Sequence, residues 1–173
     1  MRTMQLIIAL VVVWGFQGVG RAAEPCCDAV MPLNRAGNVL SGDDAILSAV
    51  QDFAVASIHR DVSMLMSLWD VGNADKVSFI QVENELPVVG LSKFRAYYEN
   101  YLANLVVLSG DVSDVQIQHV GDLAYVVCRY NWVVRSVAGG PSMAQPTRAT
   151  VILRRQGLRW VYLHLHESIT YQP

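Results

Sequence analysis

The chain has 173 residues, with 13 Lys or Arg against 15 Asp or Glu, and its formal net charge at pH 7 is −2. It contains no run of basic residues, so we do not expect nucleic acid as a partner. Its length is typical of one domain with a substantial hydrophobic core.

The first 23 residues are predicted to be a secretory signal peptide. Arg2 gives a positive start, residues 6–16 form an apolar run, and small residues precede position 24. The run is about half the ~20 residues that a membrane-spanning helix needs, so an uncleaved anchor is the weaker alternative. Removal of Arg2 and Arg21 leaves 11 basic against 15 acidic residues, a net charge of −4. We expect a periplasmic or secreted protein that makes no membrane contact after cleavage.

Residues 24–42 are rich in Pro, Gly and Asn and show no hydrophobic period, so they are predicted to be a flexible lead-in. Adjacent Cys26 and Cys27 do not easily bridge to each other without strain. An intermolecular disulfide through this pair stays open as an alternative. Cys128 lies in an apolar strand pattern and is expected to be a small buried thiol.

A single domain is predicted over residues 43–170, with helices first and strands after them. Gly42 and the residues around it supply helix-start chemistry, and apolar residues then recur at helical spacing. The expected elements of this half are helices over 46–58, 64–69 and 91–105 and a strand over 76–82.

From residue 111 onward the hydrophobic period changes to two. The expected strands cover 115–119, 123–135, 147–155 and the residues after Gly157. Short turns join these strands, so we predict an antiparallel meander with the helices on one face, an α+β fold.

The last strand has two unusual faces. Trp160, Tyr162, His164 and His166 alternate with Val161, Leu163, Leu165 and Glu167. Neither set is the polar row of a solvated sheet face, so both faces are expected to be covered, one by helices and one by another sheet or subunit.

Two stretches carry a family resemblance. The helix of residues 90–100, with its Phe-Arg-Ala-Tyr-Tyr-Glu-Asn segment, and the ending from Arg154 to Ser168 resemble the SnoaL-like/nuclear-transport-factor-like superfamily. Within it, the likeness is greatest to the association (hub) domain of calcium/calmodulin-dependent kinase II and its bacterial relatives. The likeness covers residues 43–170.

The resemblance implies a cone-shaped, curved antiparallel sheet wrapped around the N-terminal helices, with a pocket open at one end. It also implies a homodimer or a higher ring built through the outer face of the sheet. Val161, Leu163 and Leu165 would then point into the cone. The aromatic and imidazole set, with Trp160 and Tyr162, would point toward a partner subunit.

Arg129, Arg148 and Glu167 are the charged candidates for a ligand site. In the hub-like relatives a matching Arg lies in the pocket, where a guanidinium can bind a carboxylate through two hydrogen bonds. For Arg129 the alternative is an internal ion pair with Glu167. Arg148 lies two positions from an Arg of the relatives, and its alternative is a solvated strand end.

Glu167 has the parity of the cone-facing residues, whereas the hub domain has Arg at this position. A partly buried Glu there is the candidate catalytic acid or base, and the alternative is that it partners an Arg. Trp69, Tyr97 and Tyr98 recur at helical spacing; they are core residues or line the cavity.

The one-apart spacing of His164 and His166 also occurs in metal sites, but a site needs a third ligand, and only His59 and His119 remain. The resemblance places the pair on the interface side, so we expect neither a metal nor another cofactor. Glu83 and Glu85 are expected at the mouth of the pocket, where a loop acid usually faces solvent.

Three hypotheses for function follow. The first is an exported module that binds a small acidic or aromatic molecule and associates with itself. The second is a cofactor-free isomerase, cyclase or dehydratase that uses Glu167. The third is an oligomerisation domain whose cone is filled by its own side chains. An unpaired Arg129 in the cone favours the first, a polar pocket with a shifted Glu167 the second, and a filled cone the third.

Overall fold

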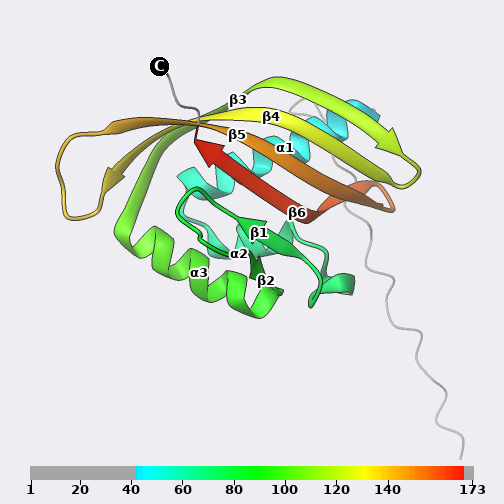
Figure 1. Cartoon of the computed structure of the whole chain (residues 1–173), viewed down its shortest axis with the longest axis horizontal. Coiled ribbons are helices and arrows are strands. Elements are labelled where there is room, and N and C mark those ends of the chain that lie inside the picture. The colour runs from blue at the N-terminus through cyan, green and yellow to red at the C-terminus, as the bar shows by residue number, and fades with distance from the viewer. Residues whose placement is uncertain (1–41, 170–173) are drawn as a thin grey trace, which may run out of the picture.

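A curved six-stranded sheet covers helices on its concave side (Figure 1). The computed structural model describes residues 42–169. The predicted signal peptide and residues 24–41 of the lead-in, with Cys26 and Cys27, lie outside the described residues, whereas Gly42 already belongs to the first helix. The helical elements are α1 (Gly42–Ile58), α2 (Val62–Ser67), the short 3-10 helix η1 (Val71–Asn73) and α3 (Leu91–Asn104). The strands are β1 (Ser78–Ile80), β2 (Val88–Val89), β3 (Leu105–Val120), β4 (Leu123–Ser136), β5 (Met143–Gln156) and β6 (Arg159–Ile169).

The strands lie in the order β2-β1-β6-β5-β4-β3. Strands β3 to β6 form the antiparallel meander that the short turns predict, and β1 joins β6 in parallel. The sheet is curved and does not close. The predicted α+β class with a cone-shaped sheet is therefore confirmed.

Strand β3 begins much earlier than its period-two pattern indicates. It starts at Leu105, directly after α3, and the β-branched residues that follow pair with the far end of β4. Register shifts at Val107/Ser109 and Ser113/Gln116 interrupt the alternation, which explains why the sequence shows only the segment near residues 115–119 as a strand.

Aromatic side chains fill most of the space inside the cone. Phe53 of α1 and Phe79 of β1 are fully buried, and Phe53 contacts rings from α3, β4 and β6. Trp69 packs against Phe94 with ring centroids 4.6 Å apart and against Tyr162 at 5.3 Å. These rings remove a large apolar area from water and give the domain its core.

Cys128 is a free, buried thiol, as predicted, and burial raises its pKa to about 12. Within residues 42–169 no helix has both the length and the apolar character needed to cross a membrane.

Candidate functional site

A β-bulge in β6 decides which of its side chains enter the cone. Ile152 of β5 pairs with His164, but Leu153 pairs with Tyr162, so Leu163 is an extra residue on β6. Because a single extra residue reverses the alternation, side chains before and after it obey opposite parities. The strict alternation expected over the whole strand is therefore wrong.

After the bulge, the expected faces are correct. Leu165 and Glu167 are 0% and 2% exposed, while the ring of His166 lies on the exposed side. Before the bulge they are wrong, because Tyr162 is fully buried in the aromatic core and Trp160 packs against that core. Neither Tyr162 nor Trp160 is on the outer face, where we had expected a partner subunit.

Glu167 ends in a set of neutral hydrogen-bond donors. Its Oε1 atom accepts hydrogen bonds from Trp132 Nε1 at 2.9 Å and from Thr147 Oγ1 at 2.7 Å. Its Oε2 atom accepts one from Gln81 Nε2 at 2.8 Å. Trp132 lies on β4, Thr147 lies on the neighbouring β5, and Gln81 directly follows β1. The carboxyl group of Glu167 therefore joins the β4–β5 hairpin to a segment far away in sequence.

Close packing against a glycine fixes the indole ring of Trp132. Gly110 of β3 lies opposite Trp132, and a Cβ atom at position 110 would come within 2.2 Å of the ring. Only glycine leaves room for the ring in this position. Tyr130 stacks on the same indole at a centroid distance of 4.9 Å.

A small pocket opens beside Glu167. Its volume is about 10 Å³, roughly the space that one water molecule needs. Besides Glu167, its polar and aromatic lining consists of Gln81, Glu83, Tyr101, Trp132, Gln145 and Thr147. No Lys, Arg or His is among the lining residues.

Tyr97 connects this pocket to the segment between β1 and β2. Its hydroxyl group contacts the Gln81 Oε1 atom at 2.7 Å and also the carboxyl group of Glu83. Burial and the hydrogen bond to Glu83 raise the pKa of Tyr97, so its hydroxyl keeps its proton. The Tyr97 hydroxyl has one hydrogen, so it donates to either Gln81 or Glu83 at a time. Tyr97 thus lies between the pocket mouth at Glu83 and Gln81, which holds the buried carboxyl group of Glu167.

Burial raises the pKa of Glu167 above its ordinary value of 4.5. The hydrogen bonds from Trp132, Thr147 and Gln81 act in the opposite direction, and the charge of Glu83 adds to the rise. The net rise means that Glu167 holds a proton more readily than a solvated Glu. Such a carboxyl group can give up or take a proton at a higher pH than a solvated Glu does.

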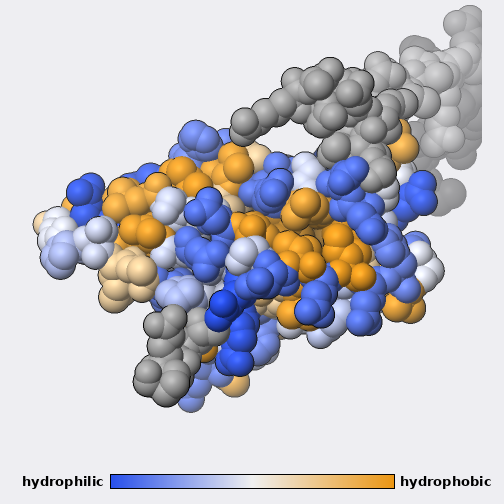
Figure 2. Space-filling view, turned by 90° about the horizontal axis from the view of Figure 1, so that it is seen from above, coloured by the Kyte–Doolittle hydropathy of each residue, from blue (hydrophilic) through white to orange (hydrophobic). Residues whose placement is uncertain are grey.

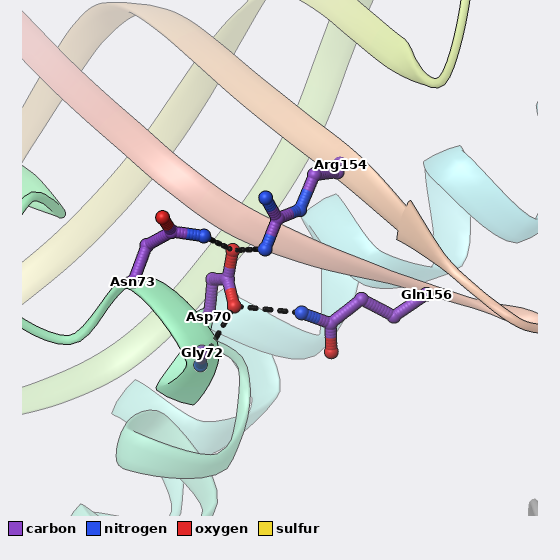
Figure 3. Close-up of polar contacts among 5 residues, drawn as sticks. All are labelled: Asp70, Gly72, Asn73, Arg154 and Gln156. Atoms are coloured by element: carbon purple, nitrogen blue, oxygen red, sulfur yellow. Dashed lines mark hydrogen bonds and ion pairs between the residues drawn. The ribbon is translucent and has the colours of Figure 1, made fainter.

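Asp70 is a second buried carboxylate, with the opposite electrostatics (Figure 3). It is 0% exposed and forms an ion pair with Arg154 of β5. It also accepts hydrogen bonds from Gly72 N at 2.9 Å, Asn73 Nδ2 at 2.8 Å and Gln156 Nε2 at 2.6 Å. Burial opposes ionisation, but these hydrogen bonds and the guanidinium outweigh it and lower the pKa of Asp70. Asp70 is thus a structural clamp between η1 and β5.

Arg129 and Arg148 lie on the outer face of the sheet, so the expectation that Arg129 faces the cone is wrong. The inward residues of β4 are those on either side of it, Cys128 and Tyr130. The Arg129 guanidinium lies 3.7 Å from the Asp114 carboxylate, and 45% of the Arg129 side chain is exposed. In the strand register Arg129 of β4 is opposite Arg148 of β5. The alternative role of Arg129, an internal ion pair with Glu167, is therefore also wrong.

The predicted aromatic ligand residues have different locations. Trp69 and Tyr98 are 1% and 2% exposed and belong to the filled core. Tyr97 is half-buried and contacts the pocket residues Gln81 and Glu83. The sequence prediction missed Gln81, Tyr101, Trp132, Gln145 and Thr147. Only Trp132 carried a signal, as an indole inside a strand that requires a hydrogen-bond partner when buried.

The histidine pair does not gather further ligands. The rings of His164 and His166 are 6.5 Å apart, and His164 Nδ1 lies 2.7 Å from Ser78 Oγ. Across residues 42–169, no three His, Cys, Asp or Glu side chains come together in a way that could hold a metal ion.

A larger hollow of about 260 Å³ lies at the other end of β6, near the start of α1. Its ionisable lining residues are His119 and Arg155, and both are exposed. His119 also contacts Asp43, an exposed acid that does not line the hollow. Since no buried charge faces this hollow, the pocket beside Glu167 is the stronger candidate site despite its smaller size.

Comparisons with known proteins agree with this architecture. A candidate NTF2-like dehydratase from Streptomyces avermitilis is 26% identical, with a TM-score of 0.64, covering 74% of this chain and 95% of that one. A candidate scytalone dehydratase from Novosphingobium aromaticivorans is 14% identical, with a TM-score of 0.65 and coverages of 73% and 83%. A ketosteroid isomerase-like protein from Erwinia carotovora atroseptica is 14% identical, with a TM-score of 0.61 and coverages of 74% and 95%.

The comparison with curated proteins gave no match. The family model described as "SnoaL-like domain" matches residues 46–172, which is most of the chain. On this match and on the curved sheet around its helices, the chain belongs to the SnoaL-like domain family.

Proposed function

We propose that this chain is an exported, self-associating SnoaL-like protein that binds a small hydrogen-bonding molecule in the pocket beside Glu167. The observation that supports this most is the isolation of the Glu167 carboxyl group. It is 2% exposed, and among the described residues its hydrogen-bond donors are neutral and no cation lines its pocket. A buried carboxyl group without a cation costs stability, and such groups concentrate at functional sites.

Asp70 provides the comparison within the same chain. There a buried carboxylate has a structural role, and Arg154 compensates its charge. Within residues 42–169 Glu167 has no such partner, so the simplest structural explanation of a buried acid does not apply to it. The absence of a basic side chain among the lining residues also changes the expected ligand. The expectation of an acidic ligand rested on Arg129 in the cone, and the Arg129 guanidinium lies on the outer face of the sheet.

Entry of a ligand larger than water requires a movement of the segment between β1 and β2. Residues 81–87 contain no strand pairing, and Leu86 in this segment is 75% exposed. The segment is attached to α3 by the contacts of the Tyr97 hydroxyl group with Gln81 and Glu83. We expect that breaking these contacts releases the segment and enlarges the pocket.

A second candidate function is proton transfer in a cofactor-free isomerase, cyclase or dehydratase. The observation in its favour is the raised pKa of Glu167, which burial causes. Some structural neighbours are named for dehydratase or isomerase-like activity. In this reading Glu167 removes a proton from the bound molecule and returns it, and Gln81 keeps the carboxyl group in position. Binding is common to both functions, whereas only the second needs the proton to move.

Self-association is proposed through the outer face of β4, β5 and β6. Seen from above, this side of the molecule shows apolar residues gathered between hydrophilic ones (Figure 2). Val127, Ile152 and Val133 are half-buried there, and Tyr125 is 40% exposed. Apolar patches of this kind mark protein contacts. A dimer is the simplest assembly, and a ring as in the hub domain of calcium/calmodulin-dependent kinase II is the larger alternative.

Export through the predicted signal peptide is part of the same proposal. The peptide, residues 1–23, lies outside the described residues, so its support is the charge and apolar run of the sequence. Expression in a bacterial host with intact-mass measurement of the periplasmic fraction tests it. A product that starts near Glu24 supports export, and a full-length cytosolic product contradicts it.

A thermal-shift screen with three proteins tests the binding proposal. Wild type, Glu167→Gln and the control Glu85→Gln are screened in parallel against small molecules. Glu85 is an exposed acid of the same segment that does not line the pocket. A true ligand at ten times its dissociation constant stabilises the fold by about 1.4 kcal/mol. We expect compounds that stabilise wild type and Glu85→Gln but not Glu167→Gln. If every stabilising compound acts equally on all three, the pocket is not the binding site and the filled-cone hypothesis is favoured.

Exchange of the α-hydrogens of acetone in D₂O, followed by NMR, tests the second candidate function, proton transfer by Glu167. Acetone is small, and its exchange needs only a base. A rate above buffer that is lost in Glu167→Gln and kept in Glu85→Gln supports proton transfer. Equal rates in the two variants contradict it.

A further inference from the structure

In the part of the chain that the structure describes, the pocket beside Glu167 is lined by acids and aromatic rings and by no Lys, Arg or His. Its charged lining residues are Glu83 and Glu167, its rings belong to Tyr101 and Trp132, and its other polar groups are neutral amides and a hydroxyl. We infer that the ligand is a small organic cation, such as a primary amine in its ammonium form. This inference rests on the proposed binding function and names the ligand class of the same site.

The sign of the lining charge excludes an anionic ligand. With both carboxyl groups ionised, the lining carries a formal charge of −2, and Glu167 is nearly fully shielded from water. A carboxylate or phosphate ligand would add like charge in a region where water screens it poorly. An ammonium group instead supplies the counter-charge that Arg154 supplies to Asp70.

The hydrogen-bonding capacity of Glu167 is not exhausted. An ionised carboxyl group has about four lone-pair sites. Oε1 accepts two hydrogen bonds, from Trp132 and Thr147, whereas Oε2 accepts only one, from Gln81. An ammonium N–H is the complementary donor for the remaining site on Oε2. The aromatic lining suits the alkyl part of such a ligand, and ring faces attract cations rather than anions.

Cation binding and protonation of Glu167 compete. A proton on Glu167 cancels its charge just as a bound ammonium group would, so the two exclude each other. Binding should therefore strengthen as pH rises through the titration of Glu167, and it should release a proton to the buffer. An anionic ligand would produce the opposite linkage, because its binding would weaken as pH rises and would take up a proton.

Three probes of similar size and different charge test the inference: ethylammonium, ethanol and acetate, titrated at constant ionic strength into the ¹⁵N-labelled full-length protein. With three or four non-hydrogen atoms, each is expected to bind in the millimolar range at best, so amide shifts are followed to about 100 mM. We expect ethylammonium to shift the amide signals of Gln81, Tyr101 and Thr147. Ethanol and acetate should do so at least about tenfold more weakly.

Two variants locate the effect. Glu167→Gln should remove the preference for ethylammonium, whereas Glu85→Gln should retain it. Equal shifts with ethylammonium and ethanol, or stronger shifts with acetate, overturn the cation inference and leave small-molecule binding intact. If none of the three probes shifts the amide signals of the lining residues, both the cation inference and the proposed small-molecule binding are overturned.

Discussion

Replacement of Asp70 by Asn should destabilise the fold substantially, although Asp70 does not line the candidate site. The carboxylate accepts hydrogen bonds from Gly72, Asn73 and Gln156 and forms the ion pair with Arg154. In Asp70→Asn one oxygen becomes an amide nitrogen, a donor that must face other donors. The charge that Arg154 requires is lost as well.

The size of the effect follows from burial. Removing one member of a buried ion pair typically costs about 3–5 kcal/mol, because the other member is left without compensation. The Arg154 side chain is 28% exposed, so water can rehydrate its guanidinium in part. We therefore expect the lower end, about 3 kcal/mol, which corresponds to a melting temperature lower by about 10 °C in a domain of this size.

Urea unfolding followed by circular dichroism measures this cost, with Asp75→Asn, an exposed acid of the same segment, as the control. The pKa of Asp70 is lowered in the folded state, below its ordinary value of 3.8. Its stabilisation is therefore complete at neutral pH and is lost as pH falls below 3.8 through the folded pKa. A loss of less than about 1 kcal/mol at pH 7, or a difference that grows toward acid, would refute this account of the clamp.

Three further outcomes are expected. Glu167→Gln should gain stability relative to wild type as pH rises above 4.5, because the raised pKa of Glu167 makes its ionisation unfavourable in the folded state; urea unfolding between pH 4 and pH 8 checks this. Gly110→Ala should lower the free energy of unfolding by about 1–3 kcal/mol and displace the Trp132 ring, which near-ultraviolet circular dichroism detects. The control Gly121→Ala, at an open turn, should leave the near-ultraviolet signal unchanged. Val127→Lys should dissociate the assembly in light scattering, while Val120→Lys, at the tip of the β3–β4 hairpin and 65% exposed, should not; an unchanged mass for Val127→Lys would rule out this face.

The order of elements could be predicted because it is encoded locally. The change of hydrophobic period from helical spacing to two, together with turns at Gly121 and Gly157, identifies the meander. The inward position of Glu167 was also predicted correctly, because Glu167 and Leu165 lie on the same side of the bulge at Leu163.

Two features could not be predicted because they depend on pairing between strands. β4 is apolar on both faces, so alternation groups Arg129 with Val127 but does not say which group enters the cone. The bulge in β6 is a property of its pairing with β5, and nothing in the alternating sequence reports the extra residue at Leu163. The first error placed Arg129 in the pocket, and the second placed Tyr162 outside the core.

The donors of Glu167 illustrate the same limit. Gln81 is 86 positions from Glu167 in sequence, and Thr147 is 20 positions from it. Polar residues of these types are common in strands and in the turns between them, so neither signals a site by itself. Only the register of β5 against β6 and the parallel pairing of β1 with β6 bring them to one carboxyl group.

The most direct test of the central claim is a ¹³C NMR titration of the Glu167 side-chain carboxyl group, assigned by comparison with Glu167→Gln. A buried carboxyl group with neutral donors and no cation should titrate above 4.5, the ordinary value for Glu, and its midpoint should fall when ethylammonium is added. A midpoint at or below 4.5 in the free protein would show that Glu167 is compensated as Asp70 is. That result would contradict its assignment as the centre of the functional site.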